Sequence, residues 1–155
     1  MDKIKEHLKR WIIDYLNNRD LIFRKISSID EAPKDCSIEV KYKDDKLSKI
    51  FILPILEDST NVIQGLKEDE GLIFACLNTK ENLAFLRKNW KQLSIFKKLS
   101  IYFINPFSKQ DKKWIIHPYT HSKICEDAAL KQGLEAMYQT VDECTISEIE
   151  SILKD

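Results

Sequence analysis

The sequence is poor in glycine and proline, with three and four of them among its 155 residues, so long flexible linkers are not expected. No apolar run approaches the 18 or so residues that a membrane-spanning helix needs. The first residues alternate acids and bases and do not form the apolar core of a signal peptide. These absences predict one cytoplasmic domain over residues 1–155, with no membrane partner.

Cysteine is also scarce, and charge of one sign does not dominate. The four cysteines are dispersed, which is typical of reduced thiols and not of a disulfide framework. The net charge is zero, which excludes the uniform positive field of a nonspecific nucleic-acid binder. The charge is nevertheless segregated: residues 80–123 hold ten basic and two acidic residues, and residues 124–155 hold two basic and eight acidic ones.

The first half of the chain predicts a helix followed by a meander of strands. Apolar residues recur at helical spacing over 2–18. Strands are predicted at 20–29, 37–43 and 47–56, and the last two form a hairpin at Asp44 and Asp45. The polar and acidic segment 57–70 is expected to be a loop with one helical turn at 62–66.

The second half predicts a right-handed βαβ crossover. Apolar runs at 71–79 and 99–106 have the composition of strands buried on both faces, and an amphipathic helix over 80–93, capped by Thr79, lies between them. A strand at 114–120 and a helix over 122–141 follow. The Thr-x-x-Glu spacing of Thr145 and Glu148 predicts a capping box for a last short helix.

These elements predict an α/β (α+β) fold: a mixed β-sheet with an N-terminal helix, a three-strand meander, a βαβ crossover and C-terminal helices. The residues expected to be buried together in its core are Trp90, Leu86, Phe74, Ile101, Phe103, Ile52 and Leu134.

The acid-x-Lys pair Glu39 and Lys41 lies on one face of a predicted strand, and Asp35 and Asp20 are nearby acids. With the order of elements, this motif resembles the restriction-endonuclease-like (PD-(D/E)XK) family. The resemblance implies a Mg²⁺-dependent nuclease in which Glu39, Lys41, Asp35 and Asp20 are catalytic. In that family the acid-x-Lys strand leads into the crossover helix, whereas strand 72–78 here has no acid or lysine, so the catalytic set is expected to be degenerate.

Two histidines and a cysteine, His117, His121 and Cys125, have the i, i+4, i+8 spacing of a helix face, and these are residue types that zinc prefers. Pro118 interrupts the spacing and no fourth ligand is local. We therefore expect no metal, with His117 ending a strand and Thr120 or Ser122 capping the following helix.

Basic side chains form a stripe on the predicted 80–93 helix. Its members are Lys80, Arg87, Lys88 and Lys91. They are candidates for contact with the phosphates of DNA or RNA, and the alternative is an ordinary solvated helix face.

Two functions from different classes remain open. The first is a nucleic-acid-associated protein with a nuclease-like, catalytically degenerate core. The second is a non-enzymatic protein-interaction or chaperone-like module, in which the basic segment binds an acidic protein surface, such as the 124–155 segment of a second copy. Neither reading requires a cofactor, apart from Mg²⁺ if the protein is a nuclease.

Overall fold

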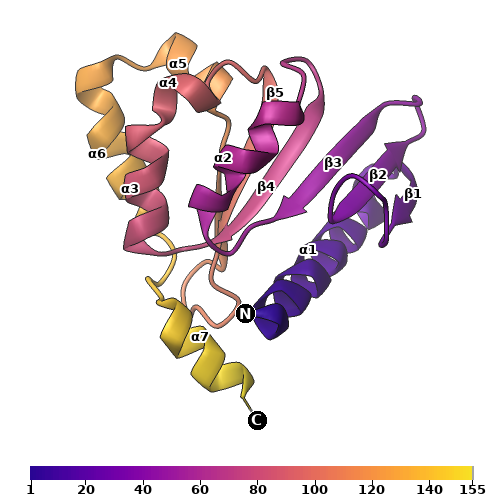
Figure 1. Cartoon of the computed structure of the whole chain (residues 1–155), viewed down its shortest axis with the longest axis horizontal. Helices are drawn as coiled ribbons and strands as arrows, with labels where there is room; N and C mark the ends of the chain where they lie inside the picture. The colour runs from indigo at the N-terminus through magenta and orange to yellow at the C-terminus, as the bar shows by residue number, and fades with distance from the viewer. Residues whose placement is uncertain (155) are drawn as a thin grey trace.

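The structure is a computed structural model that describes residues 1–154. It shows a six-stranded mixed sheet with helices on both faces (Figure 1), which confirms the predicted α/β class. The strands are β1 (Ile26–Asp30), β2 (Ile38–Tyr42), β3 (Leu47–Ile52), β4 (Gly71–Leu77), β5 (Lys98–Ile104) and β6 (Lys113–Ile116). The helices and 3₁₀ turns are α1 (Asp2–Phe23), η1 (Leu56–Asp58), α2 (Ser59–Val62), η2 (Ile63–Gly65), α3 (Lys80–Lys88), α4 (Trp90–Leu93), α5 (Pro118–Ile124), α6 (Asp127–Tyr138) and α7 (Ile146–Leu153).

Strand order across the sheet follows the order along the chain. The meander β1–β2–β3 is antiparallel, as predicted, and β3, β4 and β5 are parallel to one another. The sheet therefore contains two crossovers, and the sequence predicted only the second. Segment 57–70 was expected to be a loop with one helical turn at 62–66. That turn is present as η2, but η1 and α2 also form before it, because Leu56 and Ile63 are buried in the core.

Helix α1 is longer than the predicted 2–18, and the following strand is shorter. The apolar residues Leu21, Ile22 and Phe23 have the composition of a strand, yet they form the last turn of the helix. Arg24 ends it in the left-handed conformation at φ 50°, and its N–H donates to the carbonyl of Asp20 at 2.8 Å. The Asp20 carboxylate then accepts the N–H groups of the next two residues, and β1 begins only at Ile26.

The 80–93 helix is divided in two by Asn89, whose backbone is not helical. Thr79 caps α3 as predicted, because its hydroxyl accepts the N–H of Asn82 at 3.1 Å. The predicted helix 122–141 is likewise two helices, and Pro118 begins the first of them instead of continuing strand β6. At α7 the N-cap half of the predicted capping box is confirmed, because the Thr145 hydroxyl accepts the N–H of Glu148 at 3.1 Å.

The core consists of two layers, one on each face of the sheet. Helices α3, α4 and α6 pack on one face, and α1 and α7 pack on the other. Strand β4 contributes to both layers, because Leu72, Phe74 and Cys76 alternate with Ile73, Ala75 and Leu77. All seven predicted core residues are buried, but Ile52 lies in the α1 layer and the other six lie in the α3 layer.

Candidate functional site

The acid-x-Lys pair lies on the sheet face opposite α1. Ile38 and Val40 of β2 pack against α1, so alternation along the strand directs Glu39 and Lys41 to the other face. In the sheet register, Glu39 lies between Asp30 of β1 and Lys49 of β3. Glu39 is thus part of a row of charged side chains that crosses three strands, whereas Lys41 lies between the uncharged residues Ser28 and Leu47.

Lys49 was not singled out from the sequence, yet it is the basic residue that faces Glu39 across the β2–β3 pair. It is on β3, the last strand of the meander and the one that leads into the first crossover. Leu47 lies two residues before Lys49, so this lysine is not part of an acid-x-Lys pair. The spacing of charges along the chain does not predict that Glu39 faces Lys49, because that contact depends on the register between two strands.

The Lys49 ammonium is already neutralised by Glu70, which precedes β4. Their nitrogen and oxygen are 3.2 Å apart, and each side chain is only about one-quarter exposed. The N–H of Lys67 and then the Lys49 ammonium lower the pKa of Glu70, and the hydrogen bond to Glu70 raises the pKa of Lys49. The lysine therefore donates within the protein and is not free to bind a phosphate.

The two other predicted catalytic acids do not join Glu39 in one cluster. Asp20 belongs to α1, and its carboxylate accepts the N–H groups of Lys25 and Ile26 at 2.6 and 3.0 Å. Asp35 is exposed in the segment before β2, and its charge contributes to the raised pKa of Lys49. Among residues 1–154, no three histidine, cysteine or acidic side chains are grouped so that they could hold a metal ion.

The carboxyl ends of the parallel strands, where α/β proteins often bind ligands, are filled by buried asparagines. Asn78 accepts the indole N–H of Trp114 at 2.8 Å and donates to the carbonyl of Val141 at 3.0 Å. Asn82 donates to the carbonyls of Pro54 and Leu77 and accepts the N–H of Leu56, each at 2.8 Å. Because these amides are satisfied within the protein, this end of the sheet is a structural junction.

The His117, His121 and Cys125 side chains have separate neighbours. The Nδ1 of His117 is 2.9 Å from the hydroxyl of Ser100. The rings of His121 and Trp90 pack edge to face, with their centroids 6.4 Å apart. Burial, followed by the charge of His121, lowers the pKa of His117. His117 directly follows β6 and precedes α5, so it lies at a strand end as expected. The expected cap by Thr120 or Ser122 is wrong, because both residues lie inside α5, where the Ser122 hydroxyl donates to the carbonyl of Tyr119.

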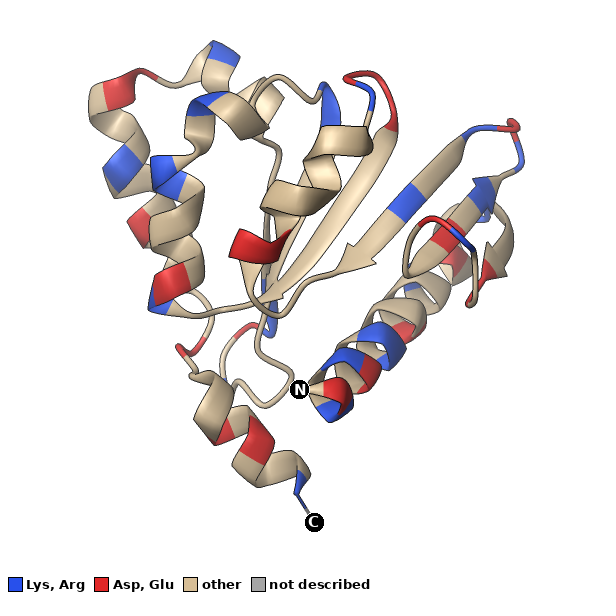
Figure 2. Ribbon diagram, viewed as in Figure 1, with Lys and Arg blue, Asp and Glu red and all other residues tan. Residues whose placement is uncertain are grey.

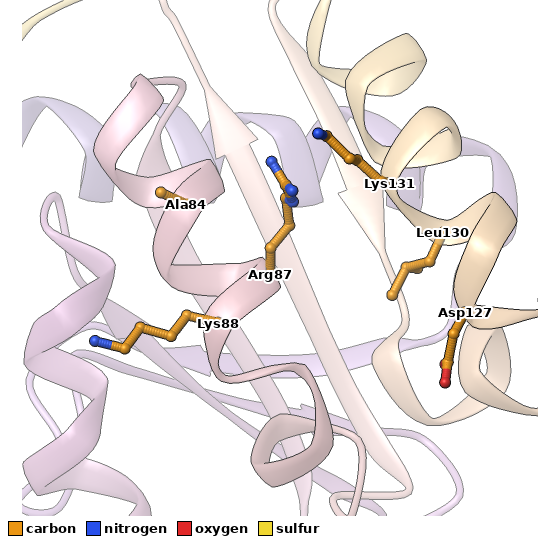
Figure 3. A pocket seen from close by; sticks show the side chains of 6 residues that line it. All are labelled: Ala84, Arg87, Lys88, Asp127, Leu130 and Lys131. Atoms are coloured by element: carbon orange, nitrogen blue, oxygen red, sulfur yellow. The ribbon is translucent and has the colours of Figure 1, made fainter.

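The basic stripe borders a hollow between α3, α4 and α6 (Figure 3). One part of the hollow, about 510 Å³, is lined by Ala84, Arg87, Lys88, Asp127, Leu130 and Lys131. The adjoining part shares Arg87 and Lys88 and adds Lys91. Lys91 joins the others although Asn89 breaks the helix, because α4 turns beside the same hollow.

Lys80 lies outside this hollow, at the first turn of α3. Its ammonium is 3.9 Å from the carboxylate of Glu143, and the guanidinium of Arg87 is 3.8 Å from that of Glu135. The acidic C-terminal part of the chain thus meets the basic segment within one molecule, and Figure 2 shows how acids and bases alternate over these helices. Both pairs are solvent-exposed, so each contributes little to stability.

Comparison of the chain with protein-family models, with curated proteins and with solved structures found no match. No helix within residues 1–154 combines the length and apolarity that crossing a membrane would require.

Proposed function

We propose that this chain is a nucleic-acid-associated protein with a nuclease-like scaffold and a degenerate catalytic set, and that it holds a phosphate backbone along the hollow between α3, α4 and α6. The observation that carries the proposal is the lining of that hollow. Four cations, Arg87, Lys88, Lys91 and Lys131, lie around it with one lining acid, Asp127, and Glu135 lies 3.8 Å from the Arg87 guanidinium. Such a cluster binds phosphates without reading bases, so we expect weak, salt-dependent binding.

The nuclease-like part of the proposal is supported by topology and by the charged row on β2 and β3. A helix, an antiparallel meander and a crossover follow one another as in the restriction-endonuclease-like family. In this proposal Glu39 takes the role of the first acid and Lys49 that of the lysine, in place of the Glu39 and Lys41 pair expected from the sequence. Leu47 stands two residues before Lys49 where an acid would be needed, and Glu70 pairs with the lysine. Because a cation would lack one of its carboxylate ligands there, the catalytic set is degenerate.

The test is a charge reversal at two hollow residues that have no acidic partner within ion-pair distance in the described structure, Lys88→Glu with Lys91→Glu. The matched control is Lys3→Glu with Lys5→Glu, because these exposed lysines lie on α1 in the other helical layer and change the net charge by the same amount. Binding to single- and double-stranded DNA is measured by fluorescence anisotropy over a range of salt concentrations.

The hollow variant should bind more weakly, and its salt dependence should fall by about 0.9 units of log–log slope per lost duplex phosphate contact. The control variant should bind nearly as the unmodified protein does. Absence of DNA and RNA binding by the unmodified protein at about 50 mM salt, where such contacts are strongest, would reject the proposal. If both variants bind DNA equally weakly, binding depends only on net charge, and the hollow is not the binding site.

A second candidate, the protein-interaction module, is favoured by one specific observation. Leu21, Ile22 and Phe23 at the end of α1 are 74%, 81% and 53% exposed, and they lie directly before the edge strand β1. Three consecutive apolar side chains that are this exposed are unusual unless they meet a partner. The acidic segment of a second copy is a less suitable partner than the sequence suggested, because Glu135 and Glu143 already pair with Arg87 and Lys80 in their own chain.

A further inference from the structure

Strand β1 leaves one edge of the sheet open. It pairs with β2 on one side only, and Ser27 and Ser28 in its middle are exposed. At the opposite edge, Asp111 beside β6 forms a bridge with Val141, so chain from the C-terminal part covers the start of that edge. Unpaired N–H and C=O groups along an uncovered edge favour pairing with another strand. In β1 the N–H of Ile26 is already bonded to the Asp20 carboxylate, so a partner strand would pair with the groups that follow it.

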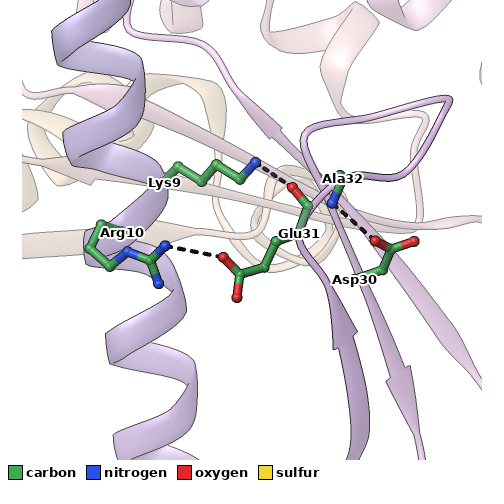
Figure 4. A network of polar contacts seen from close by, with 5 residues as sticks. All are labelled: Lys9, Arg10, Asp30, Glu31 and Ala32. Atoms are coloured by element: carbon green, nitrogen blue, oxygen red, sulfur yellow. Dashed lines mark hydrogen bonds and ion pairs between the residues drawn. The ribbon is translucent and has the colours of Figure 1, made fainter.

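Side chains of α1 and of the strand ends hold both ends of β1 in place. At its start, the Asp20 carboxylate accepts the N–H groups of Lys25 and Ile26. At its end, Arg10 of α1 pairs with the Glu31 carboxylate at 3.1 Å, and Lys9 donates to the Glu31 carbonyl (Figure 4). The extended conformation therefore exists before any partner arrives, which lowers the entropy cost of adding a strand.

The residues of this edge are self-complementary. The segment from residue 25 to residue 30 reads Lys-Ile-Ser-Ser-Ile-Asp. When two copies run antiparallel about the midpoint of the segment, Lys25 lies beside Asp30 of the second copy, Ile26 beside Ile29, and Ser27 beside Ser28. Opposite charges, apolar pairs and hydroxyl pairs are the cross-strand combinations that stabilise antiparallel strands. Glu31 takes no part in the alignment, because Arg10 already holds it.

A bulge in β1 makes this alignment compatible with two-fold symmetry. Side chains that meet across a symmetric antiparallel pair must lie on the same face of the sheet. In a regular strand, Ile26 and Ile29 would point to opposite faces. Here Ile26 lies opposite Tyr42 and Ser28 opposite Lys41, so β1 holds one extra residue, and Ile26 and Ile29 both pack toward α1.

We infer that the partner of β1 is a second copy of this chain, which adds its own β1 antiparallel and joins two six-stranded sheets into one. The inference names the partner for the interaction-module candidate and does not depend on nucleic-acid binding. The aligned segment has six residues on each side, Lys25 and the five of β1, so the dimer buries less area than a standard interface. We therefore expect an equilibrium between monomer and dimer that shifts with protein concentration.

The experiment uses two charge reversals, Lys25→Asp and Asp30→Lys, and sedimentation velocity of the full chain over a range of concentrations. Each single variant places like charges together twice in a symmetric dimer, so its dimer dissociation constant should rise about tenfold or more. When the two variants are mixed, each Asp meets a Lys, and the dimer should return as a heterodimer. Lys5→Glu on α1 is the matched control and should dimerise as the unmodified chain does.

The mixing arm distinguishes pairing from misfolding, because a variant that fails to fold cannot be rescued by another variant. Circular dichroism of Asp30→Asn is a second check that the fold does not depend on the charge of Asp30, since this change keeps an oxygen that can accept the N–H of Ala32. An unmodified chain that stays monomeric up to about millimolar concentration, where weak contacts form, would overturn the inference. So would a dimer that neither variant weakens, or two weakened variants that do not recover on mixing. DNA binding by the hollow variant is measured separately, so either proposal can fail alone.

Discussion

The side-chain oxygen of Asn78 accepts a hydrogen bond from the indole nitrogen of Trp114 at 2.8 Å, and both side chains are buried. The amide of Asn78 also donates to the carbonyl of Val141, beyond α6. One residue at the end of β4 thus connects strand β6 with the chain that leads to α7. We expect this junction to hold the C-terminal part of the chain on the sheet.

Replacing Asn78 with Ala should lower the free energy of unfolding by about 2–4 kcal/mol, because the buried groups of Trp114 and Val141 lose their partner. Urea denaturation followed by tryptophan fluorescence measures the change. Asn61→Ala, at an exposed position of α2, is the control and should cost less than about 0.5 kcal/mol. Equal stability of the two variants would show that the junction is dispensable.

A substitution at Trp90 tests whether α4 packs in the α3 layer of the core. It is 8% exposed and packs in the cluster that also contains Leu86 and Phe74. The Trp90→Ala change should destabilise the protein by about 3–5 kcal/mol, since a large cavity would remain. The melting temperature should fall accordingly in a thermal scan. An unchanged melting temperature would mean that this side of the core is packed differently.

Two glycines provide a matched pair. A Cβ at Gly71, where β4 begins beside β3, would lie 2.6 Å from the carbonyl oxygen of Leu47. Gly71→Ala should therefore destabilise by about 1–3 kcal/mol, because backbone must move. Gly133 in α6 has no atom within 4 Å of its would-be Cβ, so Gly133→Ala should stabilise by about 0.5–1 kcal/mol through helix propensity. Chemical denaturation of both variants measures the change in the free energy of unfolding. We expect a decrease for Gly71→Ala and an increase for Gly133→Ala.

The ion pair between Lys49 and Glu70 predicts a specific dependence of stability on pH. The pKa of Glu70 is lowered by folding, so its contribution is present above the unfolded pKa, near 4.5, and is lost as the pH falls through the lower folded value. The pKa of Lys49 is raised, so its contribution is lost only as the pH rises through that higher value, above 10.5. Glu70→Gln should cost about 1 kcal/mol at pH 7 and much less at pH 3.

Unfolding in urea at the two pH values checks this expectation. Asp69→Asn, the exposed neighbour of Glu70, is the control and should leave the difference between pH 7 and pH 3 nearly unchanged. A Glu70→Gln variant that loses as much stability at pH 3 as at pH 7 would contradict an ionic origin for the contact.

Catalysis by the charged row on β2 and β3 can be tested directly. We expect no Mg²⁺- or Mn²⁺-dependent cleavage of DNA, because the Asp20 carboxylate is engaged by backbone N–H groups and Leu47 stands where the motif has an acid. Plasmid DNA incubated with the protein and each cation gives the answer. Cleavage that Glu39→Gln abolishes would reverse this conclusion and restore Glu39 as a catalytic residue.

Local composition was sufficient to predict which segments form the inner strands and where several helices begin. Residues 71–77 and 98–104 are nearly all apolar, and a strand buried on both faces needs that composition. Thr79 and Thr145 cap helices by bonds to groups three residues away, so local sequence was sufficient to predict them. The helical turn at 62–66 was predicted, but η1, α2 and the length of α1 were missed, because tertiary burial and a left-handed cap overrode local composition.

Which residues lie together in the candidate sites depends on the tertiary structure. Glu39 lies between Lys49 of β3 and Asp30 of β1 because the registers of β2 with its two neighbouring strands place these residues side by side. Arg87, Lys88, Lys91 and Lys131 border one hollow only because α6 packs beside α3 and α4. The segment from Lys25 to Asp30 carries its self-complementary order in the sequence, but that order has a consequence only where the strand forms an open edge. Periodicity along a chain assigns side chains to faces, whereas pairing between strands and packing between helices decide which faces meet.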